Sequence, residues 1–181
     1  MTAPLSVHDA IRTKRAVRQF TPEPLPAETI LAILNAGRRA QSSKNVQPWH
    51  FIAITDKAIL KQLSECGQID SEGHTNTWHL AGAALGVALL SENPEEKVQR
   101  LFDLGQAAAY MQLAAWEMGV GSCLASIYEL EKARQILGFP PEWHLRFALS
   151  FGYPLKEEKL SSPPKKGGRK GLEEVVHWDK W

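Results

Sequence analysis

Cysteine, net charge and long apolar runs are all scarce in this sequence. Only two cysteines, Cys66 and Cys123, occur among 181 residues. Two are too few for a disulfide framework, so we expect buried free thiols and a cytoplasmic protein. The start has no signal-peptide pattern, and the longest apolar run, residues 83–90, is too short to cross a bilayer. The net charge of +1 is not that of a general nucleic-acid binder. We therefore predict no membrane partner and no nucleic-acid partner.

The familiar catalytic motifs are absent as well. The six histidines form no His-Glu-x-x-His and no tight group with cysteine, which argues against a metal site. No Gly-x-Ser-x-Gly, P-loop or Gly-x-Gly-x-x-Gly occurs, so a serine nucleophile and the common nucleotide-binding loops find no support. We expect no catalytic side chain. The basic and polar segments described below instead suit a bound cofactor that carries the chemistry.

Periodicity and end signals predict helices and strands within one domain, residues 1–181, in which 155–181 form a basic C-terminal loop and a dimer arm. Ser6 and Asp9 form a capping box, Asp56 caps a later helix and Gly138 ends another. The segment 68–81 has no clear period, and we expect a loop over a site there. The predicted helices are 6–14, 26–39, 57–66, one starting at 93, 102–118 and 129–137. The predicted strands are 50–55, 85–90, 121–127 and 145–151.

A basic stretch follows the first predicted helix. Residues 14–20 read Lys-Arg-Ala-Val-Arg-Gln-Phe, and with Arg12 they place four cations in seven residues. Arginine can grip a phosphate with two parallel hydrogen bonds, so the stretch could bind an anion. A solvated basic face is the alternative interpretation. A second basic cluster lies near the C-terminus and consists of Lys165, Lys166, Arg169 and Lys170.

A polar loop is expected at residues 40–49, between a helix and a strand. It is rich in amide and hydroxyl side chains, which offer donors and acceptors suited to a polar heterocycle. An ordinary surface loop is the alternative. The chain then ends in an arm that carries Trp178 and Trp181. Because tryptophans favour burial, we expect this arm to pack on a partner subunit.

Four segments, in order along the chain, resemble the nitroreductase family of flavoproteins. Residues 14–20 are similar to the family's Arg-Arg-Ser-x-Arg-x-Phe, and residues 41–49 are similar to its Pro-Ser-Ser-x-Asn-x-Gln-Pro-Trp. Residues 103–123 resemble its long central helix and the turn after it, and 169–176 resemble its basic C-terminal element. The second match is the most specific of the four.

The resemblance implies an α+β fold with a mostly antiparallel sheet flanked by helices, in an obligate homodimer that holds FMN at its interface. By position, Lys14, Arg15 and Arg18 would hold the phosphate and ribityl chain, with Arg169 adding charge. The side chains expected to reach the flavin from the partner are Ser42, Ser43 and Asn45. The backbone expected to face the flavin ring belongs to Leu124, Ala125 and Ser126. Ala16 and Gln41 also fall in the motifs, where the family has Ser and Pro, and Lys14 replaces an Arg.

The resemblance further implies a ping-pong oxidoreductase. NADH or NADPH would supply a hydride, and a nitroaromatic, a quinone or a similar electron-poor small molecule would accept the electrons at the same flavin face. Three alternatives stay open. One is a non-catalytic flavin-binding or storage protein, and another is a family relative acting in dehalogenation or flavin breakdown. The third is a basic module that binds nucleic acid.

Overall fold

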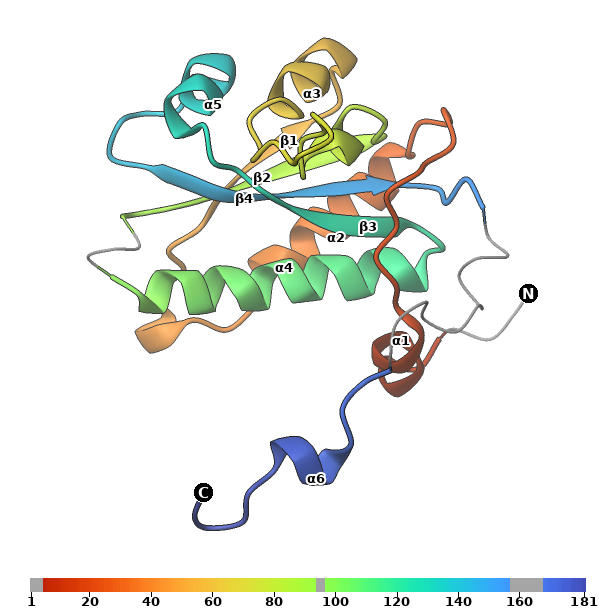
Figure 1. Ribbon diagram of the computed structural model, residues 1–181, viewed down its shortest axis with the longest axis vertical. Coiled ribbons are helices and arrows are strands. Elements are labelled where there is room, and N and C mark those ends of the chain that lie inside the picture. Colours follow the sequence, from red (N-terminus) through yellow and green to blue (C-terminus); the bar gives the residue numbers. More distant parts are fainter. Residues whose placement is uncertain (1–4, 94–96, 157–167) are drawn as a thin grey trace.

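The computed structural model describes residues 5–93, 97–156 and 168–181 and shows a sheet with helices on both faces (Figure 1). The strands are β1 (His50–Ile54), β2 (Leu85–Ser91), β3 (Gly121–Ser126) and β4 (His144–Gly152). The α-helices are α1 (Val7–Thr13), α2 (Ala27–Arg38), α3 (Lys57–Leu63), α4 (Gln99–Glu117), α5 (Leu130–Leu137) and α6 (Leu172–Val175). Short 3₁₀ turns are η1 (Ser43–Asn45) and η2 (Trp78–Leu80). The strand order is β1-β2-β4-β3 and every neighbouring pair is antiparallel. The predicted α+β class is confirmed.

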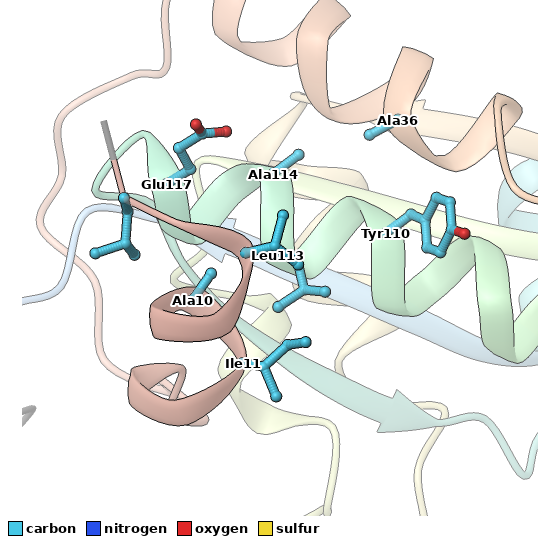
Figure 2. Close-up of a pocket in the computed structure, with 9 residues that line it drawn as sticks. Ala10, Ile11, Ala36, Tyr110, Leu113, Ala114 and Glu117 are labelled. Atoms are coloured by element: carbon cyan, nitrogen blue, oxygen red, sulfur yellow. The ribbon is translucent and has the colours of Figure 1, made fainter. Parts of the chain in front are cut away.

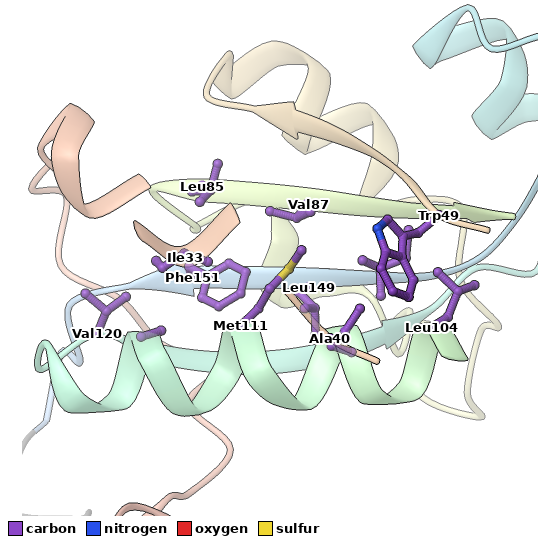
Figure 3. Close-up of a cluster of buried hydrophobic side chains, with 14 of the residues drawn as sticks. Ile33, Ala40, Trp49, Leu85, Val87, Leu104, Met111, Val120, Leu149 and Phe151 are labelled. Carbon is purple, nitrogen blue, oxygen red and sulfur yellow. The ribbon is translucent and has the colours of Figure 1, made fainter. Parts of the chain in front are cut away.

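The central strand β2 is buried along its whole length because helices cover both faces of the sheet. Alternate residues of a strand point to opposite faces. Leu85, Val87 and Leu89 pack into one core with α2 and α4 (Figure 3). Ala88 and Leu90 join a second core with α3 and α5. The prediction of a central strand at 85–90 is confirmed.

The structure shows the predicted helix ends where a capping side chain or a glycine determines them. The Asp9 N–H donates to the Ser6 hydroxyl at 3.1 Å. The Asp56 carboxylate accepts two N–H groups at the start of α3, at 2.7 and 3.2 Å. Gly138 ends α5 with a φ of 68°, a left-handed conformation that glycine adopts without steric cost.

Two boundaries differ from the prediction by three residues, and the others differ by at most one. Helix α3 ends at Leu63, three residues early, and the hydroxyls of Thr75 and Thr77 each donate to the Ser64 carbonyl just beyond it, at 2.6 Å. The N–H groups of Glu65 and Cys66 donate to carbonyls only three residues back, so the chain leaves the α-helical pattern there. Helix α4 begins at Gln99, ahead of the predicted start. The helix start predicted at 93 runs into residues 94–96, which lie outside the described residues.

The basic stretch docks on the end of the sheet beside β3 and β4 (Figure 1). The Val17 N–H donates to the Ser122 carbonyl at 2.9 Å, and the Val17 side chain is buried. Two paired glycines leave room for this contact. A Cβ on Gly121 would lie 2.6 Å from the Cβ of Val17, and a Cβ on Gly152 would lie 2.9 Å from Phe20. The sheet therefore fixes the backbone from which the basic side chains project.

Candidate functional site

Some cations of the basic stretch already form ion pairs or hydrogen bonds within the protein, and others do not. Arg12 pairs with Asp9 at 3.1 Å. Arg15 donates to three backbone carbonyls at the end of α1, at 3.1–3.2 Å. Lys14 and Arg18 form no ion pair and no side-chain hydrogen bond within the described part of the chain. These two cations are therefore available to a bound anion.

Lys14 lies in a cluster of positive charge. Burial lowers the pKa of Lys14, the Cys123 thiol acts in the opposite sense, and the charges of Arg169 and Arg18 lower it further. The charge of Arg169, from the C-terminal end of the chain, is therefore close enough to act on Lys14. The other basic residues predicted nearby, 165–166, lie outside the described residues. Within the described residues no acid forms an ion pair with these three cations, and such a group of like charges favours an anion between them.

The outer edge of β3 is open beside these cations. The Ser122 carbonyl faces outward, since it accepts the Val17 N–H. Because backbone groups alternate along an antiparallel strand, the N–H groups of Leu124 and Ser126 face outward too, whereas Ala125 faces β4. Among the described residues, neither outward N–H donates to a group beyond the sheet. Two of the three predicted backbone positions therefore present a donor to a ligand.

A cavity of about 550 Å³ includes Arg18 in its wall. The rest of its lining comes from one turn and its flanks, namely Asp70, His74, Thr75, Asn76 and Trp78. The Asn76 amide lies 3.5 Å from the Ser126 carbonyl, which ties this segment to β3. The sequence predicted a loop over a site at 68–81 but did not single out Asn76. Its position depends on a contact with a distant strand, and no motif encodes that contact.

A polar network lies beneath the β3 edge and was not predicted. His79 is 1% exposed, and its Nδ1 lies 2.8 Å from the Ser150 hydroxyl, which donates to the Cys123 carbonyl at 3.4 Å. Burial, with the charge of Arg18, lowers the pKa of His79 to about 4. Burial also raises the pKa of the Cys123 thiol. Both groups are therefore neutral at neutral pH, so His79 adds no positive charge and Cys123 adds no negative charge beside the cations.

The polar loop has a strained backbone. Three of its non-glycine residues have positive φ, namely Lys44 at 52°, Asn45 at 54° and Gln47 at 52°. Each such residue costs about 1–3 kcal/mol, and strain of this kind gathers at functional sites. The Ser42 hydroxyl accepts the Gln47 N–H at 2.9 Å, and the Ser43 N–H donates to Asp103 at 3.2 Å. Gln41 and Asn45 are exposed.

One chain does not bring the polar loop and the basic stretch together (Figure 1). The Trp116 indole N–H donates to the Thr13 hydroxyl at 3.0 Å, so one end of α4 lies beside the basic stretch. Asp103, near the other end of α4, holds the polar loop through Ser43. The thirteen residue steps from Asp103 to Trp116 span about 20 Å of helix. The two groups of predicted site residues therefore lie about 20 Å apart.

The comparison with known families decides what kind of protein this is. A profile of the nitroreductase family matches residues 11–67 and 71–153. This chain belongs to the nitroreductase family. It is an oxidoreductase by that membership, and the resemblance noted in its motifs is confirmed.

Relatives of this nitroreductase-family chain cover most of its length. A protein of Archaeoglobus fulgidus named as an NADH dehydrogenase/NAD(P)H nitroreductase is 33% identical over 82% of this chain and 85% of its own. An iodotyrosine deiodinase of Thermotoga neapolitana is 25% identical, over 82% of this chain and 88% of its own. A solved FMN-dependent nitroreductase of Clostridium difficile R20291 is 26% identical, covers 95% of this chain and 98% of its own, and superimposes with a TM-score of 0.79. The predicted nitroreductase fold is confirmed.

This nitroreductase-family chain also leaves apolar surface uncovered. A cavity of about 490 Å³ lies between α1, α2 and α4 and is lined mainly by apolar side chains, including Ile11, Tyr110 and Leu113 (Figure 2). In the C-terminal arm, Trp178 is 84% exposed and Trp181 is fully exposed. Large contiguous apolar surfaces of this kind are typical of an interface.

Two features are absent from the described residues. No helix there is both long enough and apolar enough to cross a membrane. No group of three or more His, Cys, Asp or Glu side chains there could hold a metal ion.

Proposed function

We propose that this nitroreductase-family protein is a homodimeric, FMN-dependent enzyme. It takes a hydride from NADH or NADPH and then reduces an electron-poor acceptor, such as a nitroaromatic or a quinone, in a ping-pong cycle. One observation carries the proposal. Lys14, Arg18 and Arg169 lie close together beside the open edge of β3, and among the described residues no acid pairs with them. The FMN dependence named for the solved Clostridium difficile relative supports the choice of cofactor.

The residues present fit the chemistry of FMN. A phosphate dianion would relieve the repulsion within the cation cluster, and Lys14 with Arg169 suits that role. Arg18 also lines the cavity beside β3, so it suits the ring end of the cofactor. The outward N–H groups of Leu124 and Ser126 would donate to acceptors on the polar edge of the ring. Ala16 lacks the hydroxyl of the family motif, which removes about 1 kcal/mol of binding at most.

A second copy of the chain would complete each site. Ser42, Ser43 and Asn45 lie about 20 Å along α4 from the cations of their own chain, so they do not reach the same cofactor. We propose that they contact the FMN held by the partner, with Gln41 beside them. The apolar groove of Figure 2 and the exposed tryptophans of the C-terminal arm support such pairing, because a partner would bury both.

FMN, when bound, supplies the hydride acceptance and the electron transfer, and the protein side chains bind, orient and shield it. The β3 N–H groups fix the edge of the ring. The Leu124 side chain, 46% exposed, projects from the same edge strand. His79 stays neutral above its pKa of about 4, so it adds no positive charge beneath that edge at neutral pH. One open face would admit the nicotinamide donor first and the acceptor after the donor has left.

Two further parts of the proposal concern the whole chain. We propose that residues 1–181 form a single domain and that 155–181 act as an arm on the partner. We also place the protein in the cytoplasm, because both of its cysteines, Cys66 and Cys123, are free and buried.

An absorption spectrum of the purified protein, taken anaerobically before and after NADH and NADPH, tests the function. We expect a flavin band that bleaches with one or both donors and returns on adding a nitroaromatic or a quinone. A band that never bleaches would indicate flavin storage instead. Halide release from a halogenated phenol, without turnover of either expected acceptor, would favour dehalogenation, the activity named for the Thermotoga relative. Failure to bind added FMN would overturn the proposal.

A further inference from the structure

Asp103 is a buried carboxylate that uses only part of its hydrogen-bonding capacity. Its side chain lies on α4 and is 2% exposed. One oxygen, Oδ1, accepts the Ser43 N–H at 3.2 Å. The other, Oδ2, is buried without a hydrogen-bond partner, and no cation pairs with the carboxylate, within the described part of the chain. Burying an unpaired carboxylate is unfavourable.

The surroundings of Asp103 would suit an apolar residue. Its neighbours Leu104 and Ala107 on α4 belong to the core between that helix and the sheet (Figure 3). A hydrophobic side chain at this position would avoid the cost of the orphaned oxygen. An unsatisfied buried polar group therefore needs an explanation other than stability.

The loop that Asp103 contacts supplies that explanation. Its three left-handed residues can persist only where the surroundings hold them, since each would relax to a more favourable backbone if free. At one end of the loop, Pro48 is buried and Trp49 packs into the core near Leu104 (Figure 3). At the other end, the bond from Ser43 to Asp103 is the contact between the start of η1 and α4. Asp103 and Trp49 thus hold the two ends of the strained segment.

We propose that Asp103 is a positioning residue that holds the polar loop, residues 41–47, in its left-handed conformation. In this conformation Asn45 is exposed, which is what contact with a cofactor in a second copy requires. The proposal rests on the proposed function for its ligand. Without the bond to Asp103, the loop would relax and its side chains would withdraw from the partner's FMN.

Substitution of Asp103 by an apolar residue should therefore weaken cofactor binding without lowering the stability of the protein. Asp103→Val removes the orphaned oxygen and places an apolar side chain in an apolar site, while it deletes the acceptor for Ser43. We expect an unfolding midpoint equal to or above that of the wild type, with FMN bound at least tenfold more weakly. Asp103→Asn keeps a carbonyl oxygen for the Ser43 N–H, so its FMN affinity should stay within about threefold of wild type.

The experiment compares the wild type, these two variants and Met111→Ala by thermal unfolding and by FMN fluorescence titration. Met111 is a buried apolar residue two turns further along α4 that offers the loop no hydrogen-bond acceptor like Asp103, so its loss should lower the midpoint without a matching loss of FMN affinity. Visible circular dichroism of the bound flavin reports whether its surroundings change. Wild-type FMN affinity in Asp103→Val, or a loss explained by its lowered midpoint, would overturn the proposal. A wild type that binds no FMN would instead refute the proposed function.

A second pair of variants covers the case in which Asp103→Val does not fold. Ser43→Pro removes the same hydrogen bond from the donor side, and Ser43→Ala keeps the N–H while it removes the hydroxyl. We expect Ser43→Pro to bind FMN at least tenfold more weakly than Ser43→Ala. Equal affinities in this pair would overturn the role of the bond.

Discussion

The two ends of α4 carry two unlike groups of site residues. At the end beside α1, the group consists of the cations Lys14 and Arg18, with Arg169 nearby. At the other end it is a loop of mainly amide and hydroxyl side chains with three left-handed residues, held by Asp103. The first group attracts a ligand through charge, whereas the second depends on backbone geometry. Charged residues can be identified from a sequence. A left-handed backbone conformation cannot, because it depends on the residues that pack around it.

The largest effect is expected at the charged end. Arg18→Ala should weaken FMN binding about ten- to a hundredfold, since a charge-assisted hydrogen bond contributes about 1.5–3 kcal/mol. Arg12→Ala is the matched control, because Arg12 already pairs with Asp9 and is not expected to contact the cofactor. Fluorescence titration with FMN measures both. Equal losses in the two variants would mean that the cations act only through net charge.

Acid should weaken the charged end through His79. Its pKa of about 4 in the folded protein lies below the usual 6.5, so the unfolded chain binds more protons between these values. Stability from this group is present above pH 6.5 and is lost as the pH falls through 4, by an amount on the order of 3 kcal/mol. His79→Gln should be less stable at pH 7 and should lose less between pH 7 and pH 4.5, as followed by urea denaturation. Parallel losses in both proteins would show that other groups set the acid response.

A smaller effect should come from the glycine beneath the basic stretch. Gly121→Ala would push its Cβ into Val17, 2.6 Å away, and such overpacking typically costs about 1–3 kcal/mol. Because Val17 anchors the basic stretch, FMN affinity should fall as well. Gly82→Ala meets no atom within 4 Å and serves as the control in thermal unfolding and FMN titration. A variant at 121 that behaves like the one at 82 would show that the stretch tolerates movement.

Local signals in the sequence predicted much of the fold. The capping residues Ser6 and Asp56 and the helix-ending Gly138 act on their immediate neighbours, so their effects can be read without knowing the fold. The apolar run at 85–90 reads as a central strand because burial on both faces removes polar alternation. The hydrogen bonds from Thr75 and Thr77 to Ser64, just beyond the end of α3, could not be predicted, since they join segments that are apart in sequence.

The parts of the candidate site that consist of charged residues or of sequence motifs could be predicted from the sequence. Lys14 and Arg18 stand out as a basic run, and the structure places them with Arg169. The polar loop stands out by its amide and hydroxyl side chains, whereas the β3 edge comes only from the resemblance to a family. Asn76 and Asp103 were not predicted, because each is positioned by a segment distant in sequence.

The sharing of each site between two copies is the central claim, and a mixed dimer tests it most directly. Arg18→Ala and Asn45→Ala chains, each defective alone and carrying different tags, would be co-expressed and their heterodimer purified. If Asn45 acts across the interface, one site of the heterodimer carries both defects and the other carries neither. We predict one FMN per heterodimer, bound with wild-type affinity. A confirmed heterodimer with no wild-type site would contradict the account, because each chain would then supply a complete site of its own.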